Sequence, residues 1–118
     1  MDQIKINNNL FDVKSVYTDK DISNGMMNKT FNGFDGMLFF IKPGDQSFWM
    51  KNCLIDLDII FISNDKVSKI HKECKVCKES DESKCPRFTG YADLVLELPS
   101  GTCDQYDIQV GDAVYFES

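Results

Sequence analysis

Hydrophobic residues gather in short runs between Gly36 and Ile62, in the stretch GMLFFIKPGDQSFWMKNCLIDLDIIFI. The runs are too short for helices and are rich in aromatic and β-branched residues, which favours strands. Lys42-Pro43-Gly44-Asp45 separates GMLFFI from QSFWMK and predicts a hairpin, because Pro and Gly suit its turn positions. Ser63-Asn64-Asp65-Lys66 separates LDIIFI from VSKI and predicts a second hairpin. We therefore expect this block to form the centre of one mostly antiparallel sheet.

The flanking segments add strands and short helices to this sheet. Ile4 and Ile6 alternate with polar residues before an Asn7–Asn9 turn, and edge strands are expected from Leu10 to Tyr17. Thr18 or Asp19 can cap a short helix whose buried side would hold Ile22, Gly25, Met26 and Met27. Downstream, the sequence predicts a strand at Ala92–Leu98, helical turns at Thr102–Asp107 and a last strand at Ala113–Phe116.

Alternation along the expected strands also predicts the core. In a strand, every second side chain lies on the same face. The positions expected to be mostly buried are Phe39, Phe48, Met50, Ile60, Ile62, Leu96 and Leu98.

Composition limits the class of protein. A chain of 118 residues with 42% hydrophobic residues and a mean hydropathy of -0.30 predicts a single globular domain, 1–118. Thirteen basic and 19 acidic residues give a net charge of -6, which argues against nucleic acid as a partner. No apolar run is long enough for a membrane span, and the first residues lack the apolar core of a secretory signal. We expect a monomer that is cytoplasmic if the chain is complete and exported if it is a mature fragment.

Charged and polar residues within the apolar runs are candidates for a binding site. Lys51 and Asn52 lie in an aromatic segment beside Trp49, while Asp58 and Glu97 lie in apolar runs of their own. Burying such groups without partners is costly, so Lys51 is expected within salt-bridge reach of Asp58 or Glu97. One interpretation is a ligand pocket formed by these polar residues and walled by Trp49 and Met side chains. The other is a structural ion pair at a strand end.

Conventional catalytic motifs are missing from the sequence. His71 is the only histidine and has no nucleophile motif beside it, and no phosphate-binding glycine loop or HExxH motif occurs. Asp56 and Asp58 lie two residues apart but are too few for a hard cation, so a solvated hairpin is the simpler interpretation. We expect neither a cofactor nor a conventional hydrolase.

Three cysteines lie in the charged segment His71–Arg87, HKECKVCKESDESKCPR, which we expect to form a surface loop. His71, Cys74, Cys77 and Cys85 could together supply four ligands to Zn²⁺. Free surface thiols are an alternative. Cys53 and Cys103 stand apart in the sequence and are expected to behave as small hydrophobic residues.

The order of these segments resembles the family DUF192, domain of unknown function 192. GMLF, SFWMKN, LDIIFI, a Cys/Pro loop, LVLELPSGT and IQVGD follow one another, and SNGMMNKTF resembles the family's Gly-Leu-Met-x-Arg segment, with Lys29 for Arg. The resemblance implies an α+β fold, a mostly antiparallel sheet forming a small β-barrel-like domain with one or two short helices. It also implies a disulfide between Cys77 and Cys85, and it implies no established activity. The chain departs from the pattern at Cys53 and Asp56.

Two classes of function follow. The first is a non-catalytic accessory module that binds a small molecule or a protein, with Trp49, Lys51, Asn52, Asp58 and Glu97 as candidate binding residues. The second is an enzyme of unknown reaction that uses a Lys51/Asp58/Glu97 cluster.

Overall fold

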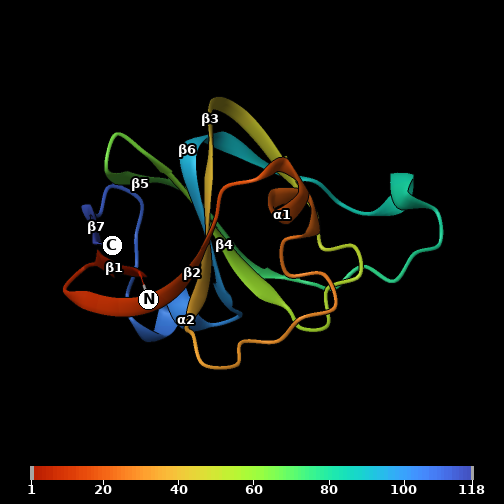
Figure 1. Ribbon diagram of the computed structural model, residues 1–118, viewed down its shortest axis with the longest axis horizontal. Helices are drawn as coiled ribbons and strands as arrows, with labels where there is room; N and C mark the ends of the chain where they lie inside the picture. Colours follow the sequence, from red (N-terminus) through yellow and green to blue (C-terminus); the bar gives the residue numbers. More distant parts are fainter. Residues whose placement is uncertain (1, 118) are drawn as a thin grey trace.

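Seven strands form one curled sheet in the order β5-β4-β6-β3-β2-β1-β7, within residues 2–117, which the computed structural model describes (Figure 1). Neighbouring strands are antiparallel except for β2 and β3, which are parallel. Two short α-helices and one 3-10 turn complete the α+β fold. The elements are β1 (Asp2–Ile6), β2 (Asn9–Val16), α1 (Asp19–Asn24), β3 (Gly36–Phe48), β4 (Leu57–Ser63), β5 (Lys66–Cys74), η1 (Glu82–Lys84), β6 (Phe88–Pro99), α2 (Thr102–Gln105) and β7 (Val114–Glu117).

The two edges of the sheet meet at one end, which gives the domain its half-barrel shape. Lys66 at the start of β5 forms a bridge with Ala113, the residue before β7. The backbone N–H of Val67 donates to the carbonyl oxygen of Asp112 at 2.9 Å. These contacts satisfy edge groups that an open sheet would leave unpaired. The β-barrel-like α+β fold that the family resemblance implies is therefore confirmed.

One of the two predicted hairpins is confirmed and the other is wrong. β4 and β5 form a hairpin closed by Asn64 and Asp65, both at positive φ, as tight hairpin turns require. Lys42–Asp45, by contrast, lies inside the continuous strand β3, which pairs with β6 along both of its halves. The register shifts between Phe40 and Gly44. Pro and Gly are compatible with a strand irregularity as well as with a turn, and here they mark the irregularity.

Both predicted helical segments are present. Thr18 caps α1, its hydroxyl accepting a hydrogen bond from the backbone N–H of Asp21 at 3.1 Å. α2 is a single turn within the predicted segment. Met26 and Met27 follow α1 in the turn after it and do not lie on the helix, although Met26 is buried as expected.

Two hydrophobic cores lie on the two faces of the sheet. Phe39 and Met50 belong to the core on the α1 side, whereas Leu96 packs inside the half-barrel with α2. Ile60, Ile62 and Leu98 are also buried inside the half-barrel. Six of the seven expected core positions are thus buried, and Phe48 is half-buried against the first core.

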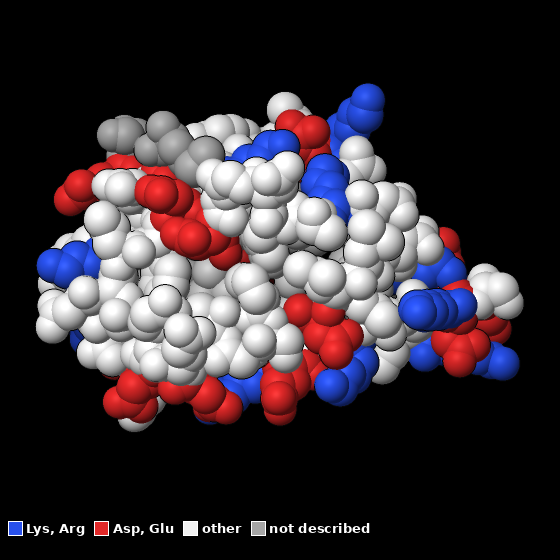
Figure 2. Space-filling model, turned by 90° about the horizontal axis from the view of Figure 1, so that it is seen from below, with Lys and Arg blue, Asp and Glu red and all other residues white. Residues whose placement is uncertain are grey.

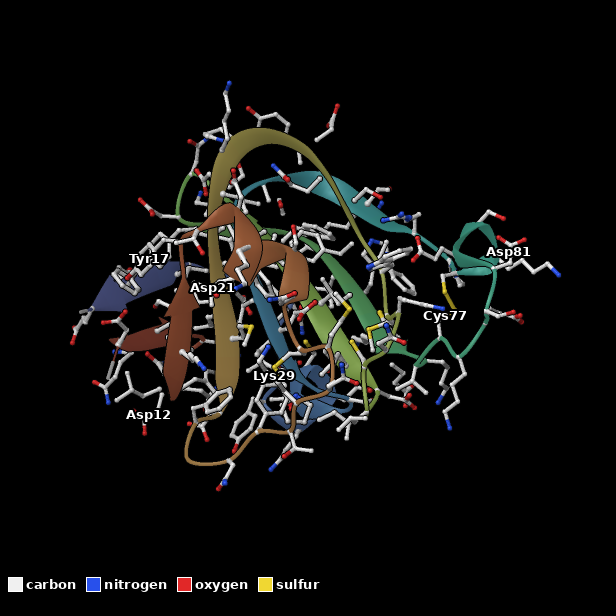
Figure 3. The ribbon with its side chains drawn as sticks, turned by 45° about the vertical axis from the view of Figure 1, so that its right-hand side comes forward. Asp12, Tyr17, Asp21, Lys29, Cys77 and Asp81 are labelled. Carbon is white, nitrogen blue, oxygen red and sulfur yellow. A yellow bond between two sulfur atoms is a disulfide. The ribbon has the colours of Figure 1, made fainter. Side chains whose placement is uncertain are left out.

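The segment His71–Arg87 is only partly the surface loop that the sequence predicts. Its first residues complete β5, and its three cysteines are buried. Cys77 and Cys85 form a disulfide with their Cα atoms 5.8 Å apart, as the family resemblance implied. The disulfide closes the base of a charged loop that projects from the body of the domain and carries Asp81 (Figure 3).

That disulfide removes two thiolates from the alternative zinc set, and no group of His, Cys, Asp and Glu within residues 2–117 is arranged to hold a metal ion. The helices described are also too short to cross a membrane.

Candidate functional site

A pocket of about 330 Å³ lies between α1 and the sheet, and we call it the α1 pocket. Its lining comes from α1 and the turn after it, from β3, from the segment after β3, from the residue before β6 and from the far end of β6. The lining residues are Ile22, Ser23, Asn24, Gly25, Met26, Met27, Phe39, Ile41, Gln46, Ser47, Phe48, Trp49, Cys53, Arg87 and Glu97.

Glu97 is the acidic residue in this lining, and its side chain is almost completely buried, with 3% exposed. Its carboxyl group makes no hydrogen bond or ion pair with any residue from 2 to 117. Burial raises the pKa of this carboxyl group to about 8. Most buried carboxyl groups in proteins have hydrogen-bond partners, so a buried carboxyl group that lines a pocket without such a partner is unusual.

Strand alternation places Glu97 on the pocket side of the sheet. In β6, Val95 and Glu97 face the α1 core, whereas Leu96 and Leu98 face the interior of the half-barrel. Glu97 lies opposite Met37 of β3 on one side. On the other side its register partner is a residue of β4 that also belongs to the α1 core. The apolar neighbours on both strands bury the carboxyl group and so raise its pKa.

Arg87 and Trp49 lie against each other in the lining of the pocket. The guanidinium carbon of Arg87 lies 4.1 Å from the centroid of the Trp49 ring, in a cation–π arrangement. The Arg87 side chain is exposed, and Trp49 is half-buried. The pocket therefore has one charged group at its accessible wall and one acidic group in its buried wall.

Cys53 lies beside Glu97 in the lining, and it is a buried free thiol. Burial, reinforced by the Glu97 carboxylate and opposed by the Lys29 ammonium, raises the pKa of Cys53 to about 12. The Lys29 ammonium donates to the carbonyl oxygen of Gly25 at 2.9 Å. Cys53 therefore remains a neutral thiol at neutral pH and is a poor nucleophile.

The structure brings only two of the predicted binding residues together. Trp49 and Glu97 line the α1 pocket, whereas Lys51, Asn52 and Asp58 do not. The Lys51 ammonium donates to the carbonyl oxygen of Glu79 in the disulfide-closed loop. The Asn52 amide contacts the Met27 sulfur at 3.9 Å.

The expected salt bridge from Lys51 to Asp58 or Glu97 is wrong. Of the ion pairs within residues 2–117, Lys72–Asp104 and Lys75–Asp56, neither includes Lys51. The strand β3 ends at Phe48, so Lys51 lies in the following segment, which leads it toward the loop. Glu97 is the register partner of Ile59, so Asp58 faces the other side of the sheet.

Asp56 and Asp58 bind backbone groups and do not form a pair of catalytic carboxylates. Asp58 accepts hydrogen bonds from the backbone N–H groups of Glu73 at 2.8 Å and Cys103 at 2.9 Å. Asp56 accepts one from Val76 at 2.9 Å, and this bond, with help from Lys75, lowers the pKa of Asp56. The interpretation of these two residues as a solvated hairpin is corrected, since each carboxylate anchors a neighbouring segment.

His71 and Cys74 are likewise held by structural contacts. The His71 ring nitrogen Nε2 lies 2.8 Å from the carbonyl oxygen of Thr89, and the ring packs against Phe61 and Phe88. Cys74 is a buried free thiol, and burial raises its pKa to about 12.

Sequence reasoning missed Arg87, Gln46 and Ser47 as lining residues. Arg87 follows the disulfide-closed loop, whose return path to the sheet is set by the Cys77–Cys85 bond. Gln46 and Ser47 were missed because the second half of β3 was expected to fold back on the first. Met27, predicted on the buried side of the first helix, lines the pocket from the turn after α1.

Comparison with known proteins gives one family and two solved structures. The model of the family DUF192, described as uncharacterized ACR, matches residues 2–116. A crystal structure of a protein of unknown function from Novosphingobium aromaticivorans matches with 28% identity and a TM-score of 0.81, covering 96% of this chain and 83% of the other. A candidate transcription regulator from Sinorhizobium meliloti matches with 22% identity and a TM-score of 0.83, covering 98% of this chain and 94% of the other, and this second likeness concerns the fold alone. No curated protein shows significant similarity to the chain.

Proposed function

The chain belongs to the DUF192 family, which is described as uncharacterised, so we infer its function from the geometry of this protein. We propose that it is a non-catalytic module that binds a small ligand in the α1 pocket. The observation that carries this proposal is the buried Glu97 carboxyl group, which lines the pocket without a hydrogen-bond partner among residues 2–117. A ligand that supplies this partner would remove an energetic cost of the free protein.

The form and lining of the pocket support this proposal. A volume of about 330 Å³ falls at the lower end of the range typical of small-molecule sites. Aromatic and sulfur-containing side chains supply apolar contact area, including Phe39 and Phe48 of β3 and Trp49 directly after it. A few polar groups in a mostly apolar concave site are what fixes the orientation of a ligand.

The alternative of an enzyme based on Lys51, Asp58 and Glu97 has less support. Lys51 contacts the carbonyl of Glu79, and Asp58 accepts hydrogen bonds from two backbone N–H groups on the opposite face of the sheet from Glu97. The pocket thiol, Cys53, is neutral at neutral pH, so thiolate chemistry is disfavoured as well. Binding needs none of these groups to act together.

The position of Trp49 provides a direct test, because it is the only tryptophan of the chain and lines the pocket. We expect a small neutral aromatic probe, para-methylbenzyl alcohol, to change Trp49 fluorescence in a saturable manner. Ser47→Phe introduces a bulky ring at an exposed lining position and should weaken this binding at least tenfold.

Ser80→Phe is the matched control, since Ser80 is an exposed residue of the disulfide-closed loop and does not line the pocket. This variant should bind the probe as the wild type does. An absence of saturable binding, or equal affinity in Ser47→Phe and wild type, would contradict the proposed function.

A further inference from the structure

The charged residues of the α1 pocket lie at two different depths. Glu97 is buried in the wall formed by the sheet, and Arg87 is exposed and lies over Trp49. Both line the same pocket, yet no ion pair joins them among residues 2–117. The buried carboxyl group and the exposed guanidinium group are therefore both available to a ligand.

Glu97 favours a ligand group that donates hydrogen bonds and carries positive charge. No residue from 2 to 117 donates a hydrogen bond to its carboxyl group. An ammonium group offers up to three donors and neutralises the buried carboxylate, and charge-assisted bonds of this kind are stronger than neutral ones. The aromatic wall beside it attracts cations through the faces of its rings.

The groups that surround Glu97 do not already fill this role. Cys53, on the segment after β3, and Cys74, on β5, remain neutral thiols at neutral pH. The Lys29 ammonium, on the segment after α1, is held by the carbonyl of Gly25. Asp58, on β4, lies on the opposite face of the sheet.

Arg87 favours a negatively charged group at the accessible wall. Its guanidinium group stacks on Trp49 and makes no ion pair with any carboxylate in the part of the chain described. A planar guanidinium can bind a ligand carboxylate through two parallel hydrogen bonds while it keeps its stacking contact.

We infer that the ligand of the α1 pocket is a small zwitterion with an apolar middle, whose ammonium group binds Glu97 and whose carboxylate binds Arg87. This inference rests on the proposed function and adds the chemical class of the ligand. A zwitterion has no net charge, so its binding depends on these two local groups and not on the net charge of -6 or on the mixed charges of the exposed surface (Figure 2).

The test compares four probes of one shape, measured by isothermal titration calorimetry. Para-(aminomethyl)benzoate carries both charges, para-methylbenzylamine the positive one and para-methylbenzoate the negative one, and para-methylbenzyl alcohol is neutral. The zwitterion should bind most tightly. Glu97→Gln should weaken binding of the two amines about tenfold to a hundredfold and leave the benzoate and the alcohol unchanged. Arg87→Gln should weaken binding of the two carboxylates about twofold to fivefold, as expected for an exposed ion pair.

Glu82→Gln, on the exposed 3-10 turn, serves as the control and should leave all four affinities unchanged. Proton release provides a second measurement. Because the carboxyl group of free Glu97, with a pKa of about 8, is mostly protonated near neutral pH, amine binding should release a proton there. The amine affinity should rise about tenfold per pH unit below this pKa and level off above it.

The outcomes separate the inference from the proposed function. If Glu97→Gln weakens the binding of the amines and of the alcohol equally, the inference of a zwitterionic ligand is wrong, while the proposal of ligand binding stands. The same holds if the amines bind no more tightly than the alcohol. If none of the four probes binds, both are wrong.

Discussion

The Asp58 carboxylate accepts a hydrogen bond of 2.9 Å from the backbone N–H of Cys103, and this bond joins strand β4 to the first turn of helix α2. The residue before α2 is Gly101, which has no side chain to cap the helix. Asp58 supplies the missing acceptor from another element, with its negative charge at the positive end of the helix dipole. Its second oxygen accepts from the N–H of Glu73 near the end of β5, so one carboxylate fixes two segments.

Replacing Asp58 with Ala should lower the free energy of unfolding by about 2–4 kcal/mol. Two backbone N–H groups would lose their acceptor, and hydrogen bonds to charged groups contribute more than neutral ones. Asp58→Asn keeps one oxygen acceptor, so its free energy of unfolding should fall by less than that of Asp58→Ala. Urea denaturation followed by circular dichroism measures both effects. Asp45→Ala, at an exposed carboxylate of β3, is the control and should change stability by less than about 0.5 kcal/mol.

Replacing Leu96 with Ala should cost about 2–5 kcal/mol, because the side chain is completely buried inside the half-barrel and its removal leaves a cavity. The same urea experiment measures this change. Leu54→Ala removes the same atoms from an exposed side chain and should have little effect. Equal losses in the two variants would contradict the assignment of Leu96 to the core.

Local signals were sufficient to predict most of the fold. Asn64-Asp65 could be assigned to a turn because both residues tolerate positive φ, and Thr18 to a helix cap because its hydroxyl can accept a backbone N–H. The hairpin predicted at Pro43-Gly44 is wrong because these residues suit a strand irregularity as well as a turn. Only the pairing of β3 with β6 distinguishes the turn from the irregularity. The disulfide came from family resemblance and not from spacing alone.

The candidate site could be predicted only in part, because a pocket depends on how strands pair. Alternation within one strand gives the relative faces of Val95 and Glu97, but the face that Glu97 shares with Asp58 depends on the register between β4 and β6. A shift of one residue would have placed the two carboxylates on the same side. Arg87 reaches the pocket from a loop, where sequence periodicity gives no direction.

The five cysteines should separate into three protected thiols and one disulfide. Cys53, Cys74 and Cys103 are buried and free, and Cys77 is joined to Cys85. In the folded protein, brief treatment with iodoacetamide should label none of them, because burial raises the pKa values of the free thiols to about 12.

After denaturation, mass spectrometry should show three labels without reductant and five with it. Peptide mapping then identifies the protected pair. Labelling of Cys77 and Cys85 without reductant would contradict the disulfide. Cys77→Ser combined with Cys85→Ser should cost less than about 3 kcal/mol, since the closed loop is short, with a sequence separation of 8 between the two cysteines.

The stability of the protein without ligand should fall as the pH rises from about 4.5 to about 8, because of Glu97. Burial raises the pKa of its carboxyl group from 4.5 to about 8 in the folded state, so the folded protein holds this proton more tightly than the unfolded chain does. The stability that Glu97 contributes is therefore fully present below its pKa in the unfolded chain. It is lost as the pH rises toward its pKa in the folded protein. A tenfold difference in proton affinity between the folded and unfolded states corresponds to about 1.4 kcal/mol, so the total loss is several kcal/mol.

Glu97→Gln removes this titration, and the comparison with wild type isolates it from all other groups. The difference in unfolding free energy between Glu97→Gln and wild type should grow in favour of the variant from about pH 5 to about pH 8, measured by urea denaturation at each pH. Asp56, whose pKa is lowered, acts in the opposite sense, since its contribution is lost only as the pH falls below its usual value of 3.8, outside this range. Glu82→Gln should follow the wild type throughout, because its side chain is exposed. A constant difference between Glu97→Gln and wild type across the range would mean that Glu97 is ionised in the folded protein, and the pocket would then contain a compensating group that the structure does not place there.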